Sequence, residues 1–202
     1  MNLFDEFDNN VLPFDGEVYY TQNFLPHSVQ KTIFNKLLEK IPWKQDELIL
    51  FGKKITTQRK IAFYSDEGIN YTYSNSKKDS LPWFEELYDL KSKIENHSNT
   101  SFNACLINLY KDGSEGMGWH SDNEPELVKE GIIASLSLGA TRIFDFKHIQ
   151  TNSKTSILLE GGSLLCMQGK TQKYWKHQLP KSKKIAQARI NLTFRQIRDY
   201  KH

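Results

Sequence analysis

The chain has few cysteines and no long hydrophobic run, and each absence excludes a class of protein. With only Cys105 and Cys166 among 202 residues, no disulfide framework can form, so we expect a reducing intracellular compartment, cytoplasm or nucleus. Each cysteine lies in an apolar run, which predicts a buried core position. No apolar run approaches the ~20 residues of a membrane-spanning helix. The first residues also lack the basic and apolar regions of a secretion signal, so no membrane partner is expected.

Acidic and basic residues are unevenly distributed along a chain whose formal net charge is +3. The first 30 residues contain five acids and no lysine or arginine, so the remainder carries 27 basic and 19 acidic residues. This surplus is compatible with a polyanionic partner such as nucleic acid, although solvated lysine faces are commoner than binding faces. A hydrophobic content of 38% is ordinary for a globular domain.

Apolar periodicity predicts helices in the first half of the chain. Residues 1–25 read as an extended arm with a short strand at 18–20. Ser28 is predicted to cap a helix that ends near Ile41, and a second helix is predicted to start near Ser80. The side chains expected to face inward are Val29, Ile33, Phe34, Leu37, Leu38 and Ile41 in the first helix and Phe84, Leu87, Tyr88 and Ile94 in the second. Residues 45–76 fit no helical period and are read as strands and loops.

Short strands broken by glycines are predicted from residue 103 onward. They cover residues 103–110, 132–138, 142–146, 156–159, 163–167 and 188–197. Strands of this number and spacing are typical of a sandwich or a jelly-roll barrel. Helices followed by strands give an α+β fold class.

His120 and Asp122 form an H-x-D triplet directly after an expected strand. In extended backbone, residues i and i+2 point to the same face, so the two side chains would converge. Two such ligands and a second histidine make the facial triad of non-haem Fe(II) oxygenases. Alone, the triplet also fits an exposed polar turn. His177, which follows an apolar strand and a glycine-containing turn, is available as the third ligand.

The segment 189–195 alternates strictly between polar and apolar residues. One face carries Ile190, Leu192 and Phe194, and the other carries Arg189, Asn191, Thr193 and Arg195. Polar groups of this kind directed into a barrel are costly unless they meet an anion, and arginine pairs bidentately with carboxylates. A small dicarboxylate would satisfy them. The alternative is a pair of surface arginines on an edge strand.

These motifs together resemble the AlkB family of Fe(II)- and 2-oxoglutarate-dependent dioxygenases, and most of all its vertebrate DNA-repair type, homologues two and three. The resemblance rests on Asn108-Leu109-Tyr110, on residues 118–125 and 135–142, on His177 and on residues 189–195. It implies a double-stranded β-helix (jelly roll) core with N-terminal helices and a nucleotide-recognition lid. We therefore expect an arm (1–25), helices and lid (26–102) and a catalytic core (103–202) in one folded domain.

The resemblance also implies the cofactors and their ligands. Iron would be held by His120, Asp122 and His177, and 2-oxoglutarate by Asn108, Tyr110, Arg189, Asn191, Thr193 and Arg195, with Arg189 on the distal carboxylate. The implied activity is oxidative demethylation of N1-methyladenine and N3-methylcytosine in DNA repair, which uses Fe(II), O2 and 2-oxoglutarate and releases succinate, CO2 and formaldehyde. The expected partner is alkylated DNA, single- or double-stranded, with RNA as a further candidate, and the resemblance suggests a monomer.

A methylated base edge is buried in duplex, so the base must be flipped out or arrive single-stranded. The resemblance places an unstacking wedge at Phe51-Gly52-Lys53, although Phe51 read alone fits a core position equally well. The implied base pocket contains Tyr71, Tyr73, Asn123 and Glu124, with Tyr73 and the ring of His120 on opposite faces of the base. Asn123 stands where the family commonly has Asp. Arg142 is expected to orient Glu124 or Asp122, or to pair on the surface.

Two alternatives stay open. The first keeps the iron and 2-oxoglutarate but changes the substrate to RNA or protein. The second is a nucleic-acid-binding jelly roll without catalysis. A dead site has no reason to keep three metal ligands and two arginines, which speaks against the second alternative.

Overall fold

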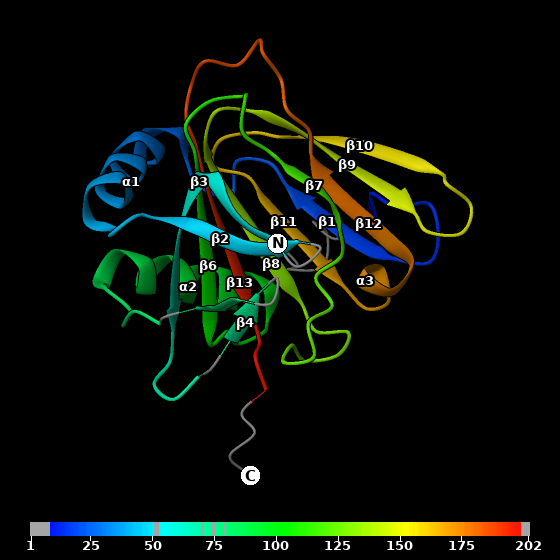
Figure 1. Ribbon diagram of the computed structural model, residues 1–202, viewed down its shortest axis with the longest axis horizontal. Coiled ribbons are helices and arrows are strands. Elements are labelled where there is room, and N and C mark those ends of the chain that lie inside the picture. Colours follow the sequence, from blue (N-terminus) through cyan, green and yellow to red (C-terminus); the bar gives the residue numbers. More distant parts are fainter. Residues whose placement is uncertain (1–8, 51–52, 70, 74–75, 79, 199–202) are drawn as a thin grey trace.

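Two antiparallel sheets form the framework of the protein, seen in a computed structural model that describes residues 9–50, 53–69, 71–73, 76–78 and 80–198 (Figure 1). Over residues 46–50, 53–55, 71–73 and 76–78 the description is limited to the backbone. The larger sheet consists of β1 (Glu17–Thr21), β11 (Leu164–Gln168), β8 (Ile133–Gly139), β13 (Arg189–Arg195), β6 (Ala104–Tyr110), β3 (Lys53–Ser65) and β2 (Lys44–Leu50), in that spatial order. The smaller sheet consists of β10 (Lys154–Leu159), β9 (Arg142–His148), β12 (Trp175–Leu179) and β7 (Met117–His120). The short strands β4 (Tyr71–Tyr73) and β5 (Ser76–Lys78) pair with each other.

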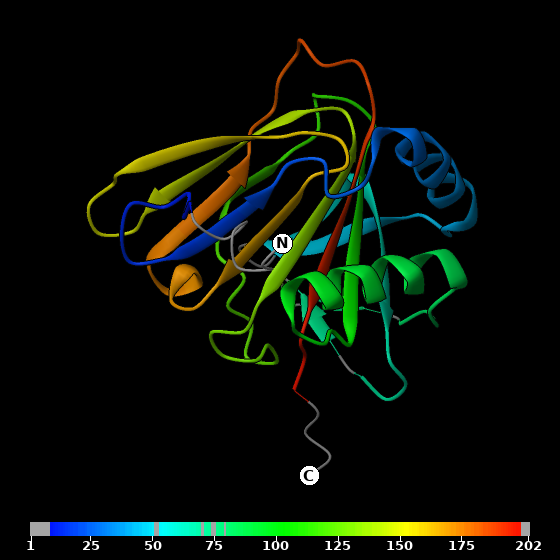
Figure 2. The ribbon, with the colours of Figure 1, turned by 180° about the vertical axis from the view of Figure 1, so that it is seen from behind.

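The larger sheet separates two apolar cores. One core lies between this sheet and the helices α1 (His27–Lys40) and α2 (Glu85–Ser98), which Figure 2 shows against its outer face. The other core lies between the two sheets. Because side chains alternate along a strand, β13 directs Ile190, Leu192 and Phe194 into the helix-side core and its polar residues between the sheets. No helix in the described part of the chain combines the length and the apolar character needed to cross a bilayer.

The predicted α+β class and jelly-roll framework are confirmed. Each of the six strands predicted after residue 103 is present, with its ends moved by no more than two residues. The predicted strand at 18–20 is β1, which pairs with β11 at the edge of the larger sheet. Cys105 and Cys166 are buried as predicted, and burial raises the pKa of both thiols, to about 12 for Cys166.

Both predicted helices form, but their N-termini differ from the prediction. Pro26 occupies the N-cap of α1 and no side chain caps the helix, so the predicted role of Ser28 is wrong. The second helix begins at Glu85 instead of near Ser80. The intervening Leu81 is held as a β-bridge, because its N–H donates to the carbonyl of Phe63 at 2.9 Å. This tertiary hydrogen bond therefore keeps Leu81 out of the helix, and α2 begins four residues later, at Glu85.

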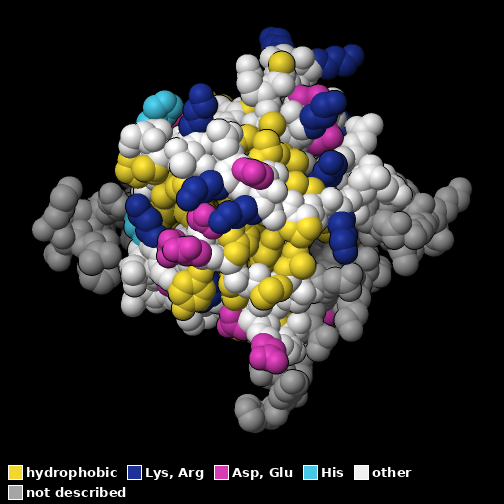
Figure 3. Space-filling view, turned by 90° about the vertical axis from the view of Figure 1, so that its left-hand side faces the viewer, with side chains coloured by type: hydrophobic (Ala, Val, Ile, Leu, Met, Phe, Trp, Pro, Cys, Tyr) yellow, Lys and Arg dark blue, Asp and Glu magenta, His cyan; other side chains and the backbone are white. Residues whose placement is uncertain are grey.

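Three apolar residues predicted to face the core are exposed instead: Val29 by 39%, Leu38 by 42% and Tyr88 by 52%. A period of four residues drifts on a helix of 3.6 residues per turn, so Val29, eight residues before Leu37, lies about 80° from it around the axis. Leu38 directly follows Leu37 and therefore lies about 100° from it. Leu37 is fully buried and fixes the centre of the packed face. Figure 3 shows the helix-covered side of the molecule, where apolar side chains lie among lysines and acids.

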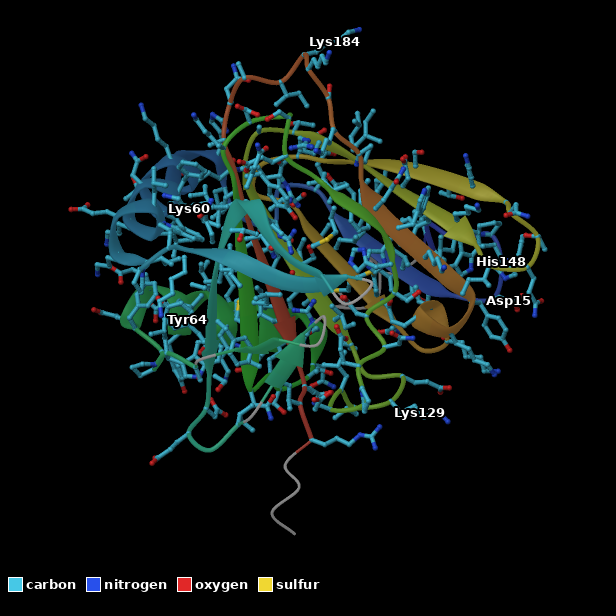
Figure 4. The ribbon with its side chains drawn as sticks, in the orientation of Figure 1. Asp15, Lys60, Tyr64, Lys129, His148 and Lys184 are labelled. Atoms are coloured by element: carbon cyan, nitrogen blue, oxygen red, sulfur yellow. The ribbon has the colours of Figure 1, made fainter. Side chains whose placement is uncertain are left out.

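The segment before β1 packs behind β12 and the short helix α3 (Thr171–Tyr174). The indole N–H of Trp175 donates to the carbonyl of Phe14 at 3.0 Å. His148 Nε2 lies 3.5 Å from a carboxylate oxygen of Asp15, and Figure 4 shows the two side chains together. This part of the predicted arm therefore supports the strand that carries His177.

Candidate metal centre and anion site

Three side chains with metal-binding atoms meet between the two sheets. His120 ends β7 and faces His177 of β12 in register, which brings their Nε2 atoms within 3.1 Å. Asp122 follows β7 and places Oδ1 3.8 Å from His120 Nε2. One ligand atom from each residue lies within 4.8 Å of the other two. Neighbouring ligands of an octahedral ion with bonds of about 2.1 Å lie about 3 Å apart, so the spacing suits a divalent transition metal.

Hydrogen bonds orient these ligands toward a common point. His120 Nδ1 lies 2.8 Å from the carbonyl of Gly118, so Nδ1 carries the proton and Nε2 keeps its lone pair. Arg195 donates to Asp122 Oδ2 at 3.1 Å. The other oxygen, Oδ1, is buried and accepts no hydrogen bond from the described residues. Arg195 therefore holds the carboxylate by Oδ2, and Oδ1 is left to act as a metal ligand.

Electrostatics keep both buried ligands in their metal-binding protonation states. Burial, reinforced by His120, lowers the pKa of His177 to about 3, so its imidazole is neutral at physiological pH. Burial alone would raise the pKa of Asp122, but the positive charge of Arg195 and the neighbouring histidines outweigh it and hold the pKa at about 2. Metal binding near neutral pH therefore requires no proton to leave these two groups.

A cavity of about 50 Å³ adjoins the three ligands, and the residues predicted to bind 2-oxoglutarate line it. They are Asn108 and Tyr110 from β6 and Arg189, Asn191, Thr193 and Arg195 from β13. β6 and β13 are hydrogen-bonded neighbours, with Asn108 opposite Asn191 and Tyr110 opposite Arg189. The structure thus brings all six residues to one place beside the metal ligands.

Arg189 is a buried cation, with 2% of its surface exposed. It donates to Ser137 Oγ at 2.9 Å and lies over the ring of Tyr110, while its Nε has no hydrogen-bond partner among the described residues. None of the described ion pairs includes it. Burial lowers the pKa of Arg189 to about 10, which leaves it charged at neutral pH. A buried guanidinium in this state fits the carboxylate of a bound anion.

The other polar side chains of β13 are already engaged. The amide nitrogen of Asn191 donates to Ser135 Oγ at 2.8 Å and to the Leu136 carbonyl at 3.2 Å. Its oxygen accepts a hydrogen bond of 3.3 Å from the Thr193 hydroxyl. These contacts make Asn191 and Thr193 part of the cavity wall and leave Asn191 no amide proton directed at a ligand.

The predicted substrate contacts are only partly described. Phe51 and Gly52 lie outside the described residues, whereas Lys53 starts β3 and Tyr71 and Tyr73 bound β4, where the backbone alone is described. Asn123 is exposed and Glu124 is half-buried in the loop after β7. The side chain of His120 is 28% exposed, which leaves part of its ring accessible.

The expectations for Arg142 are wrong. This residue is 1% exposed and therefore does not pair on the surface. Its guanidinium donates to the backbone carbonyls of Asp112, Glu115 and Pro180 instead of contacting Asp122 or Glu124. It ties the loops before β7 and after β12 together. The sequence carries no signal for these partners, because each is a backbone carbonyl.

Sequence reasoning also missed four polar residues that hydrogen-bond to residues of the site: Arg59, Ser135, Ser137 and Gln172. Ser135 and Ser137 alternate with buried leucines along β8, so the same alternation that identified β13 could have found them. Gln172 accepts from the backbone N–H of Asp122 at 2.9 Å, and Arg59 donates to Asn108. Neither contact could have been read from local sequence.

Comparison with known proteins agrees with this geometry. The model of the 2OG-Fe(II) oxygenase superfamily matches residues 17–195. Alpha-ketoglutarate-dependent dioxygenase alkB homolog 3 of Bos taurus is 37% identical over 82% of this chain and 61% of that protein. DNA oxidative demethylase ALKBH2 of Homo sapiens is 39% identical over 73% of this chain and 60% of that protein, and ALKBH2 of Mus musculus is 36% identical over 82% and 74%. The chain thus spans about three-fifths of the length of the first two of these relatives.

A solved structure, that of OsALKBH1, has the same fold, with a TM-score of 0.60 at 20% identity over 89% of this chain and 97% of that one. The family model and the relatives that are more than a third identical to this chain over most of its length lead to one assignment. The chain belongs to the 2OG-Fe(II) oxygenase superfamily and, within it, to the AlkB family.

Proposed function

We propose that this protein is an oxidative demethylase of alkylated nucleic-acid bases that uses Fe(II), O2 and 2-oxoglutarate. The observation that carries the proposal is that three metal ligands lie beside Arg189, a buried arginine that forms no ion pair with the described acids. In the overall reaction an N-methyl group, O2 and 2-oxoglutarate become the unmethylated base, formaldehyde, succinate and CO2. The names of the relatives, a dioxygenase and a DNA oxidative demethylase, support the same reaction here.

Each part of the site has a role in this reaction. Fe(II), when bound, supplies the activation of O2 that side chains cannot perform. His120, Asp122 and His177 would hold it, and Arg189 would bind the distal carboxylate of 2-oxoglutarate. The ring of His177 is 3% exposed and stacks on Phe144 at 5.3 Å, which keeps water away from this side of the metal site.

A second, larger cavity beside the metal site supports a nucleic-acid substrate. Its volume is about 440 Å³, and it shares Asp122 and Arg195 with the site. Among the described residues that line this cavity, the exposed cations are Lys129, labelled in Figure 4, Lys173, Lys176 and Arg198, and the single exposed acid is Glu130. Cations that outnumber acids next to the reacting centre suit the phosphates that flank a target base.

Replacement of Lys173 and Lys176 by alanine is expected to weaken nucleic-acid binding in a salt-dependent way. The slope of log affinity against log salt should fall by about 1 for each phosphate that no longer meets a lysine. The measurement is fluorescence anisotropy of a methylated single-stranded oligonucleotide between about 50 and 200 mM salt. Lys31→Ala, exposed on α1, is the matched control and should keep the original slope. Equal slopes in all proteins would rule out a phosphate-binding role for these lysines.

Phe51→Ala is expected to lower activity on duplex DNA about tenfold while activity on single strands changes little, because unstacking a base costs a few kcal/mol only in duplex. Formaldehyde release from the same methylated sequence, alone and annealed, measures the difference. An equal loss on both substrates would argue against the wedge and for a core position.

The substrate is identified by one comparison. Succinate and formaldehyde are measured with methylated DNA, methylated RNA and a methylated peptide under identical conditions. Formaldehyde release stimulated by nucleic acid alone supports the proposal, whereas stimulation by peptide would replace it with a protein oxygenase. Absence of succinate with every substrate would leave a binding module without catalysis. We further propose that the protein is intracellular and monomeric. Size-exclusion chromatography tests the monomeric state.

A further inference from the structure

Arg59 of β3 reaches one of the cavity-lining amides from outside the cavity. β3 pairs with β6, with Ile61 opposite Asn108, so Arg59 lies two residues along the same face. Its Nε donates to Asn108 Oδ1 at 3.1 Å. Both residues are buried, with 5% and 4% of their surface exposed. Arg59 does not line the 50 Å³ cavity, whereas Asn108 does.

The contact fixes which end of the Asn108 amide faces Arg59. A guanidinium has only hydrogen-bond donors, so it can bind the amide oxygen but not the amide nitrogen. With Oδ1 engaged by Arg59, the NH2 group must point elsewhere. The NH2 group of Asn108 makes no hydrogen bond with any other residue that the structure describes. It is therefore a donor available to a ligand in the cavity.

The amide of Asn191, opposite Asn108, has its NH2 group already engaged. Asn191 faces Asn108 across the β6–β13 pair, but its nitrogen donates to Ser135 and Leu136. Of the two amides predicted to contact 2-oxoglutarate, only Asn108 presents protons to an anion. A carboxylate accepts hydrogen bonds and cannot donate them, so the direction of this amide decides whether the contact attracts or repels it.

We infer that Arg59 is a positioning residue that fixes the amide of Asn108 with its NH2 group toward 2-oxoglutarate. This inference rests on the proposed function, because it takes 2-oxoglutarate as the anion. Arg59 acts through Asn108 and does not itself touch the co-substrate. Neither sequence motifs nor the residues predicted for the site include this arginine.

The test measures 2-oxoglutarate binding without turnover. The full chain is loaded with Mn(II) in place of Fe(II) and titrated with 2-oxoglutarate by calorimetry, with no nucleic acid present. Arg59→Met should bind about tenfold more weakly, because an oriented hydrogen bond to a charged group is lost. Arg59→Lys should stay within about threefold of the wild type, because an ammonium is also a donor-only group. Lys60→Met, exposed on the opposite face of β3, is the matched control and should bind normally.

A double-variant cycle separates positioning from other roles of Arg59. If Arg59 acts through Asn108, the protein with both Arg59→Met and Asn108→Leu should bind 2-oxoglutarate as weakly as Asn108→Leu alone. Additive losses would overturn the inference, and so would unchanged affinity of Arg59→Met. If Arg59→Met fails to fold, Arg59→Gln replaces it: its amide can donate or accept, so it should bind more weakly than Arg59→Lys. Failure of the wild type to bind 2-oxoglutarate would instead overturn the proposed function.

Discussion

Asp122→Ala is expected to reduce succinate and formaldehyde formation at least about 1,000-fold, because two ligands cannot hold iron as the three-ligand site does. In the structure this carboxylate offers Oδ1 to the metal position and receives Arg195 on Oδ2. The substitution removes both interactions. Turnover is measured on a methylated oligonucleotide with saturating Fe(II) and 2-oxoglutarate.

Two matched variants make this result interpretable. Asp122→Asn keeps an oxygen for Arg195 but removes the anionic metal ligand, so it should fold like the wild type and still be inactive. Asp89→Ala, exposed on α2, should leave activity unchanged. Circular dichroism checks the fold of each protein. Full turnover by either Asp122 variant would remove this residue from the metal site.

Arg189→Met is expected to have opposite effects on binding and on stability. The KM for 2-oxoglutarate should rise about 100-fold or more, because a buried ion pair with a carboxylate is worth several kcal/mol once one partner is removed. The cofactor-free protein should be as stable as the wild type or more stable by about 1 kcal/mol, because a buried cation without an ion-pair partner is costly. Initial rates at varied 2-oxoglutarate and urea unfolding of the metal-free protein measure the two quantities.

Arg142→Met is the control for burial. Arg142 is as buried as Arg189, but its guanidinium satisfies three backbone carbonyls. Its loss should therefore destabilise the fold by about 2 kcal/mol or more. If Arg189→Met destabilised the protein as much as Arg142→Met, Arg189 would have a structural role in place of an anion-binding one.

Strand alternation accounts for most of what the sequence can predict. The polar face of β13 follows from the order of its residues, and it lines the cavity together with Asn108 and Tyr110. The pairing of His120 with His177 is not predictable in this way, because it depends on the register between β7 and β12, which are more than fifty residues apart in the chain. Alternation tells which residues share a face but not which faces meet.

The predictions that were wrong or missed share one physical cause, which is that they depend on tertiary contacts. The late start of α2 depends on a hydrogen bond from Leu81 to β3, and the burial of Arg142 depends on carbonyls from separate loops. The contact from Arg59 to Asn108 joins two residues that are 49 positions apart in the chain. None of these interactions leaves a local pattern, since each partner comes within reach only in the folded chain.

The position of β13 in the sheet order has a consequence for how the protein is made. β13 is the last strand of the described chain, yet it lies between β6 and β8 near the middle of the larger sheet. At about 5–20 residues per second, β6 emerges on the order of 10 s before its partner is synthesised. Until then the sheet has a gap at its centre, and both arginines of the anion site are missing. A chain that stops before β13 therefore has neither the complete sheet nor the two arginines of the anion site, and both are gained in one step when β13 is added.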